Sequence, residues 1–308
     1  MDNTQHNFIT VQGLKLHLAE LGSGPNVVLF LHGFPEIWYS WRHQTVAVAN
    51  AGFRAVAPDY KGYGLSDPPP EPEKATFADL ISDVVAIIDH LGVFVIGKDT
   101  GGLVANFFAV LHPDRVSGVV TFGVPFIPPP FQFHEQLPEG FYVGRFMQPG
   151  RAEVDFRPFD AKTVVKNIYI LFSRSEIPIA AENQEVMDLV DPSTPPPAWF
   201  TEEDLAVYGA LYEKSGFQTA MKVPYKAMHE EEFGLTDPKL EAPALLIMGC
   251  KDYILKFPGM EDYIKSGKVK EVVPKLDTVF LSEGSHFVQE QLPELVNELI
   301  LGFLKVHS

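Results

Sequence analysis

The chain has 308 residues, of which 46% are hydrophobic and 21% are charged, a balance typical of a globular protein with a sizeable core. Acidic residues outnumber basic ones by 40 to 24, giving a formal net charge of −16, so a nucleic-acid partner is not expected. No run approaches the ~18 apolar residues of a membrane span. Residues 1–4 lack the basic and apolar regions of a signal peptide. The single cysteine, Cys250, cannot form an internal disulfide. We therefore expect a reducing, cytoplasmic environment and a buried structural cysteine.

Predicted strands and helices alternate along the first 125 residues. The predicted strands are 8–21 (two strands that turn at Gln12-Gly13), 26–31, 53–57, 93–96 and 116–123. A helix begins after Thr76, which forms a capping box with Asp79 and is followed by apolar residues at helical spacing to about residue 91. A second helix follows the strand at 93–96 and ends at Leu111, before a proline. This alternation predicts an α/β fold with a mostly parallel sheet and right-handed crossovers.

The alternation stops between residues 126 and 235. This segment is rich in proline and aromatic residues and contains helical stretches but no convincing strand. Strands at 244–248 and 278–281 and helices at 258–266 and 293–304 follow it. We predict one α/β core formed by residues 1–125 and 236–308, with residues 126–235 inserted as a helical cap. Ligands of open α/β sheets bind beyond the carboxyl ends of the strands, so we expect the cap to cover the site.

The strand at 93–96 leads into the sequence Gly97-Lys98-Asp99-Thr100-Gly101. Glycines on both sides of one polar residue are typical of a sharp strand-to-helix turn that holds a nucleophile at its apex. The apex residue here is aspartate, whose carboxylate is ionised at neutral pH. A carboxylate suits displacement at saturated carbon, because the product is an ester that water can hydrolyse. The alternative is that Asp99 only caps the following helix.

Two residues near later strand ends are suited to activate that water. Asp252 follows the strand at 244–248, and His286 follows the strand at 278–281. The order Asp99, Asp252, His286 is the nucleophile–acid–base order of a strand–turn–helix hydrolase. We predict that His286 is the base and that Asp252 orients it.

The sequence His32-Gly33-Phe34-Pro35 follows the strand at 26–31. The backbone N–H groups of Phe34 and Thr100 are predicted to form an oxyanion hole, although a plain tight turn has the same sequence. No Cys/His cluster indicates a metal site and no phosphate-binding loop is present. We therefore expect neither a metal nor a cofactor.

Taken together, these motifs resemble those of the soluble epoxide hydrolases of the α/β-hydrolase superfamily, and the plant members most. The shared motifs are HGFP at 32–35, YSWRHQ at 39–44, DYKGYGLS at 59–66, Gly97-x-Asp99, Asp252 and Gly284-x-His286. The resemblance implies an α/β-hydrolase fold with a cap whose two tyrosines, here Tyr142 and Tyr225, donate hydrogen bonds to the epoxide oxygen. It also implies substrate contacts by Phe34, Trp41 and Thr100.

The implied partners are a small-molecule epoxide and water, with a vicinal diol as the product. Epoxy fatty acids or aryl epoxides, and a role in detoxification, agree with the resemblance. The oligomeric state is left open between monomer and homodimer.

The sequence departs from the family around the apex, where His-Asp-Trp is common and Lys98-Asp99-Thr100 stands here. We expect Lys98 to be a surface or structural cation that lowers the pKa of a neighbour. The segment before Asp99 is also a few residues shorter than usual, and a strained or shifted strand there would displace the nucleophile and weaken activity.

Two other functions remain open. A dehalogenase uses the same chemistry but often needs a tryptophan beside the nucleophile, which Thr100 does not supply. A non-catalytic ligand receptor on the same fold is the second. A serine esterase is disfavoured, because no G-x-S-x-G sequence occurs.

Overall fold

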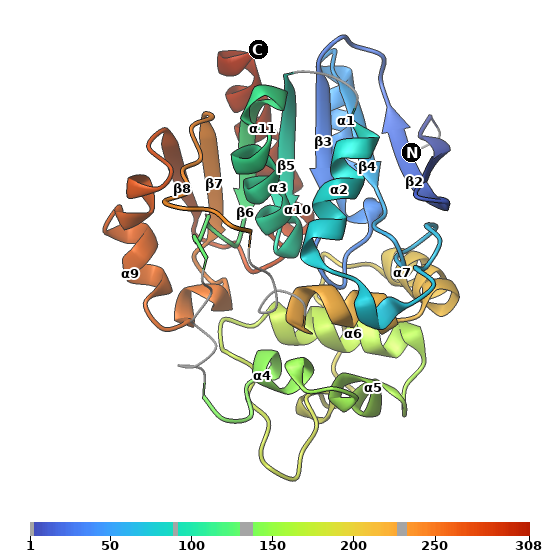
Figure 1. Cartoon of the computed structure of the whole chain (residues 1–308). Coiled ribbons are helices and arrows are strands. Elements are labelled where there is room, and N and C mark those ends of the chain that lie inside the picture. Colours follow the sequence, from blue (N-terminus) through green and yellow to red (C-terminus); the bar gives the residue numbers. More distant parts are fainter. Residues whose placement is uncertain (1–2, 89–91, 130–137, 227–232) are drawn as a thin grey trace.

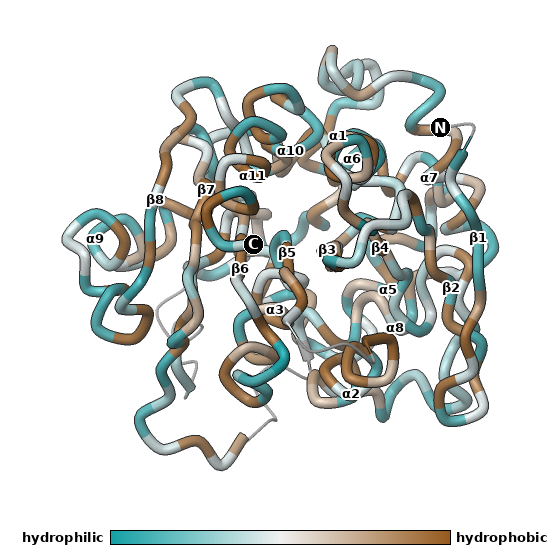
Figure 2. The backbone as a smooth tube through the Cα atoms, turned by 90° about the horizontal axis from the view of Figure 1, so that it is seen from above, coloured by the Kyte–Doolittle hydropathy of each residue, from teal (hydrophilic) through white to brown (hydrophobic). Residues whose placement is uncertain are grey.

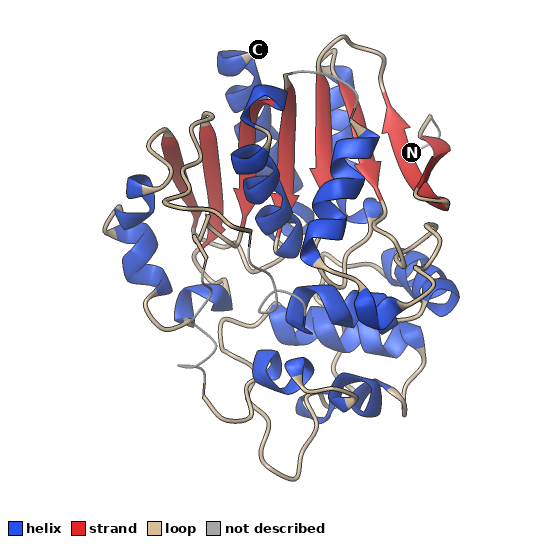
Figure 3. Cartoon of the chain, in the orientation of Figure 1, coloured by secondary structure: helices blue, strands red, loops and turns tan. Residues whose placement is uncertain are grey.

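The computed structural model describes residues 3–88, 92–129, 138–226 and 233–308. Within these residues, eight strands form one sheet in the order β1-β2-β4-β3-β5-β6-β7-β8 (Figure 1, Figure 3). The strands are β1 (Gln5–Val11), β2 (Leu14–Leu21), β3 (Val27–Leu31), β4 (Arg54–Pro58), β5 (Val93–Lys98), β6 (Val116–Phe122), β7 (Ala244–Gly249) and β8 (Leu276–Leu281). Neighbours from β4 to β8 are parallel, whereas β1 and β2 are antiparallel to their neighbours. The predicted α/β class is confirmed, with bounds that differ by a few residues.

The central strands are buried on both faces, which explains their continuous apolar sequences. Every residue of β3, β5 and β7 is buried. The register sets their carboxyl ends level, because Leu31 lies opposite Gly97, and Gly249 lies opposite Leu281. The loops that leave these strands therefore meet at one edge of the sheet.

Helices cover both faces of the sheet. Seen from above, α2 (Phe77–Ile87) and α3 (Thr100–Leu111) lie on one face, and α1 (Arg42–Asn50), α10 (Val288–Gln291) and α11 (Pro293–His307) lie on the other (Figure 2). The capping box at Thr76 and Asp79 is formed in both directions, as predicted. The predicted end of that helix falls on residues 89–91, which lie outside the described residues. Helix α9 (Met260–Lys265) lies beside β8.

A second group of helices lies beyond the carboxyl ends of the strands (Figure 1). We call α4 (Tyr142–Met147), α5 (Arg151–Phe156), α6 (Ala161–Phe172), α7 (Glu202–Ser215) and α8 (Gln218–Met221) the roof helices. In the described residues between them the only extended pairing is an isolated bridge between Phe141 and Ile179. The predicted cap boundaries at 126 and 235 stay a prediction, because residues 130–137 and 227–232 lie outside the described residues.

Buried charges join the roof helices to the core. Arg42 of α1 pairs with Glu290 of α10, and its Nε lies 3.1 Å from Oδ1 of Asp204 in α7. The hydroxyl groups of Tyr169 in α6 and Tyr208 in α7 donate to Glu290 over 2.7 and 3.2 Å. Removing one partner of such a buried pair typically costs about 3–5 kcal/mol, because the other charge is left unpaired. The roof helices are therefore fixed to the core by this five-residue cluster.

Cys250 is exposed, so the prediction of a buried cysteine is wrong. The apolar run of β7 ends at Gly249, and the chain turns toward solvent at the next residue. Among the described helices, none has the length and apolar character needed to cross a bilayer.

Candidate active site

Asp99 stands at the apex of the turn between β5 and α3, with φ 54° and ψ −124°. The turn needs its glycines, because a Cβ at Gly97 would lie 2.2 Å from the carbonyl oxygen of Gly101. A Cβ at Gly101 would lie equally close to the carbonyl oxygen of Leu31 in β3. The Asp99 side chain makes no capping bond to α3, so the helix-cap alternative is wrong.

The pairing of β5 with β6 is regular over the residues that lead directly into the turn. The pairing of β5 with β6 is irregular between Val93 and Phe94, and the remaining residues to Lys98 pair in regular register. The apex of the turn therefore keeps its place at the centre of the sheet edge. The strand length gives no displacement of Asp99 from the residues predicted to act with it.

Three predicted residues come together at this edge. Nε2 of His286 lies 3.5 Å from Oδ2 of Asp99. Nδ1 of the same imidazole lies 3.0 and 3.1 Å from the two carboxylate oxygens of Asp252. Asp252 leaves β7 and His286 leaves β8, so their meeting follows from the level ends of these neighbouring strands.

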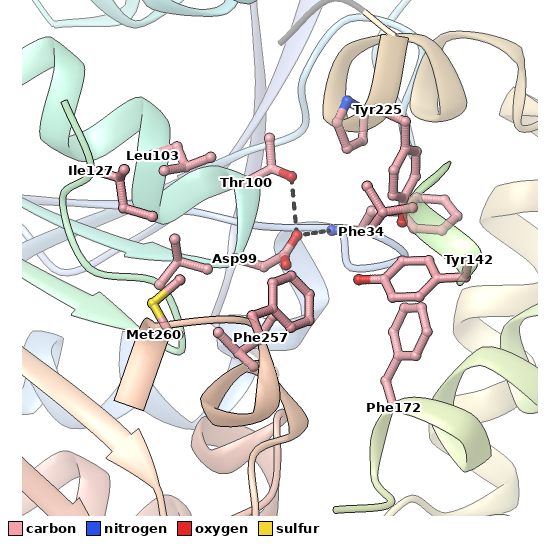
Figure 4. A pocket seen from close by; sticks show the side chains of 14 residues that line it. Phe34, Asp99, Thr100, Leu103, Ile127, Tyr142, Phe172, Tyr225, Phe257 and Met260 are labelled. Atoms are coloured by element: carbon pink, nitrogen blue, oxygen red, sulfur yellow. Dashed lines mark hydrogen bonds between the residues drawn. The ribbon is translucent and has the colours of Figure 1, made fainter. Parts of the chain in front are cut away.

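The other oxygen of Asp99 is held by two donors. The backbone N–H of Phe34 donates to Oδ1 over 3.4 Å, and the hydroxyl of Thr100 donates to the same oxygen over 3.0 Å (Figure 4). Phe34 was a predicted donor. The hydroxyl of Thr100 was not predicted, because only its backbone N–H was considered. The carboxylate therefore has one held oxygen and one oxygen that faces His286.

The electric field of the site favours an ionised nucleophile. Burial opposes ionisation, but the hydrogen bond from His286 and the charge of Lys98 hold the pKa of Asp99 well below its usual range. Burial and Lys98 lower the pKa of His286, yet Asp252 and Asp99 outweigh them and raise it above its ordinary value. The His286 imidazole therefore gains a proton at a higher pH than a free imidazole does.

Asp99 opens onto an apolar cavity, and its side chain is 21% exposed. The empty space among its lining atoms amounts to about 690 Å³, with open solvent at its mouth included. Its lining residues are Phe34, Asp99, Thr100, Leu103, Val124, Ile127, Tyr142, Val143, Phe172, Pro224, Tyr225, Ile254, Phe257 and Met260. Figure 4 shows Leu103, Ile127 and Met260 on one side of Asp99 and Tyr142, Phe172 and Tyr225 on the other.

Both predicted tyrosines line this cavity. The ring centroids of Tyr142 and Tyr225 lie 6.0 Å apart, and burial raises the pKa of each hydroxyl. Both phenols therefore stay protonated at neutral pH and keep a hydrogen to donate. The hydroxyl groups of Tyr142 and Tyr253 also share a hydrogen bond of 2.8 Å. Sequence reasoning missed Tyr253, although it follows Asp252 directly.

Two other residues differ from expectation. Trp41 is fully buried between Phe30 and Phe122 and does not line the cavity, so the structure gives no support to its predicted substrate contact. Lys98 is also fully buried, which makes the surface interpretation wrong. Its ammonium lies 2.8 Å from Nε2 of His286. Its effect on a neighbouring pKa, however, was predicted.

Glu36 is a buried carboxyl that sequence reasoning missed. Its Oε2 accepts from the backbone N–H of Gly33 over 3.0 Å, and its Oε1 accepts from the side chain of Gln289. Burial raises its pKa to about 7, and the charge of Lys98 offsets part of this rise. Its position directly after the HGFP sequence was the available signal. Within the described residues, no group of three or more His, Cys, Asp or Glu side chains is placed to hold a metal ion.

Comparison with known proteins identifies the family of this chain. The family model for the alpha/beta hydrolase fold matches residues 26–291. Epoxide hydrolase 1 of Siraitia grosvenorii is 38% identical over 319 residues, covering 99% of each chain. The structure of potato (Solanum tuberosum) epoxide hydrolase I is 33% identical, with a TM-score of 0.89, covering 98% of this chain and 99% of that one. A Vigna radiata epoxide hydrolase mutant is 34% identical, with a TM-score of 0.91, covering 99% of both. The chain therefore belongs to the α/β-hydrolase family and, within it, to the epoxide hydrolases.

Proposed function

We propose that the protein hydrolyses epoxides to vicinal diols through a covalent ester on Asp99. The observation that carries the proposal is the asymmetric setting of this carboxylate. Oδ1 is held by Phe34 and Thr100, and Oδ2 faces His286. Two protonated tyrosines line the same cavity. This setting suits a nucleophile that attacks carbon while a phenol protonates the leaving oxygen.

In the first step, Oδ2 of Asp99 forms a bond to an epoxide carbon and the bond from that carbon to the ring oxygen breaks. Tyr142 and Tyr225 donate hydrogen bonds to the oxygen, which takes a proton from one of them. The product is an ester of Asp99 with one free hydroxyl group. No part of this step requires His286 to accept a proton.

In the second step, Nε2 of His286 takes a proton from water, and the water oxygen adds to the ester carbon of Asp99. The oxyanion forms on Oδ1, where Phe34 and Thr100 already donate. The bond between the ester carbon and the alkyl oxygen then breaks, and that oxygen takes the proton from His286. The new carboxyl group of Asp99 releases a proton that restores the tyrosine. Asp252 holds the imidazole through Nδ1.

The polarity of the cavity supports an apolar substrate. The side of the cavity away from the tyrosines is lined by Leu103, Ile127 and Met260 (Figure 4). Aryl epoxides and the chains of epoxy fatty acids have the apolar surface to fill it. Among the described residues that line it, none is a lysine or an arginine, so we propose that the carboxylate of an epoxy fatty acid lies outside the lined space. A role in removing reactive epoxides in the cytoplasm fits this chemistry and the single cysteine.

The test is single-turnover hydrolysis of an aryl epoxide in ¹⁸O-water with enzyme in excess. The ester mechanism places the label in the peptide that contains Asp99, because the diol takes its new oxygen from the carboxylate. A diol that carries the label directly, with none in the peptide, would contradict the proposal. The variant His286→Gln is the matched control, and we expect it to accumulate the ester.

A further inference from the structure

Both ring nitrogens of His286 already have partners. Asp252 accepts from Nδ1 at 3.0 Å, so Nδ1 carries the hydrogen of the neutral imidazole and Nε2 holds the free lone pair. The ammonium of Lys98 lies 2.8 Å from Nε2 and has only hydrogens to offer. In the neutral imidazole, the lone pair that must take a proton from water is therefore engaged by Lys98. Only the protonated imidazole can donate from Nε2 toward Oδ2 of Asp99, which lies 3.5 Å away.

Lys98 is held in this position by its surroundings. It is the last residue of β5 in the middle of the sheet, and none of its surface is exposed. Its ammonium lies 5.7 Å from the centre of the Phe287 ring, a distance at which the ring face attracts a cation. The anion Asp99 and the carboxyl Glu36 lie close enough to feel its charge. A side chain in this setting has little room to leave His286 for solvent.

The two half-reactions differ in whether they tolerate the hydrogen bond between Lys98 and Nε2 of His286. Ester formation needs an ionised Asp99, which the positive charge of Lys98 favours, and it does not use the lone pair of His286. Ester hydrolysis needs that lone pair free to accept a proton. The hydrogen bond from Lys98 must therefore break before water can be activated.

We propose that Lys98 is a positioning residue that restrains His286 and so makes hydrolysis of the Asp99 ester slower than its formation. The inference rests on the proposed function and deepens it, because it assigns the slow half of the reaction. The protein then spends most of each turnover as the covalent ester. Removing the donor frees Nε2 and speeds the second half-reaction.

The experiment compares wild-type protein with Lys98→Met and Lys98→Leu. Enzyme in excess is mixed with an aryl epoxide and quenched in acid at intervals, and intact mass measures the ester. Methionine has a similar length and no donor hydrogen, and leucine, which also has none, provides a second variant should methionine prevent folding. Lys98→Arg keeps a cationic donor and serves as the matched control. We expect the ester of the methionine variant to decay at least tenfold faster than in wild type, while its formation changes less.

Faster decay of the ester is the informative result, because damage to the fold slows both half-reactions. An ester that decays at the wild-type rate or more slowly in both the methionine and the leucine variants would overturn the inference alone. Absence of any ester in wild type and in His286→Gln would overturn the proposed function, and this inference with it. An arginine variant that matches wild type while the methionine variant is fast would support the inference.

Discussion

The hydroxyl of Thr100 gives the sharpest test of how the two steps differ. It donates to Oδ1 of Asp99 over 3.0 Å. The substitution Thr100→Val removes this donor and keeps the branched shape of the side chain. The charge of Asp99 disappears when the ester forms, so the lost donor stabilised the starting carboxylate more than the first transition state. In the second step, negative charge develops on Oδ1 itself.

The expected change in the rate of ester hydrolysis follows from the strength of this hydrogen bond. A hydrogen bond to a charged group contributes about 1.5–3 kcal/mol, which corresponds to about a 10- to 150-fold change in rate. Ester hydrolysis in Thr100→Val should therefore slow by this factor. Ester formation should stay the same or rise slightly, because the carboxylate of Asp99 becomes less stabilised.

The assay measures both rates in one rapid-quench experiment, from the appearance and the decay of the ester mass. Thr100→Ser is the matched control, since it keeps the hydroxyl and loses only a methyl group. Equal slowing of both steps in Thr100→Val, or no slowing of hydrolysis, would refute the assignment of this hydroxyl to the oxyanion.

Three further predictions follow from the site and the turn. Although burial and Lys98 lower the pKa of His286, Asp252 and the ionised Asp99 raise it above its ordinary value in the free protein, so an NMR titration of this imidazole without substrate should give a midpoint above ~6.5; a midpoint below ~6.5 would contradict this. Tyr142→Phe and Tyr225→Phe should each slow ester formation by about 10- to 100-fold and leave its hydrolysis largely unchanged, since each removes one donor to the developing alkoxide; rapid quench separates the two rates. Gly101→Ala should lower the free energy of unfolding by about 1–3 kcal/mol or more, because its Cβ would lie 2.2 Å from a carbonyl oxygen of β3. Gly144→Ala, in open space on α4, is the control in urea unfolding and should be neutral or stabilising.

Much of the core followed from local sequence signals. The apolar run before Gly97 and the glycines of the turn predict a strand, a sharp turn and a helix, because each depends on neighbouring residues alone. The positions of Asp252 and His286 after later strands place them at the same sheet edge, since parallel strands end together. These signals can be recognised in the sequence without knowledge of side-chain contacts.

The contacts of three residues could not be predicted from the sequence, namely those of Lys98, Trp41 and Thr100. Lys98 meets His286 across 188 positions of sequence, and a cation at a strand end is as compatible with solvent as with burial. Trp41 lies in a short 3₁₀ helix (Trp38–Trp41) whose orientation turns the indole toward the sheet. The rotamer of Thr100 decides whether its hydroxyl faces the cavity or Asp99, and no sequence pattern fixes that angle.

The cluster around Arg42 and Glu290 has a consequence for how the protein unfolds. Its charges are shared between α1 and α10 of the core and α6 and α7 of the roof. Separating the two parts would expose Glu290 without its tyrosine donors and would leave Arg42 without Asp204. Heating should therefore melt the roof and the sheet in one cooperative transition, with no intermediate in which the sheet persists and the roof has detached.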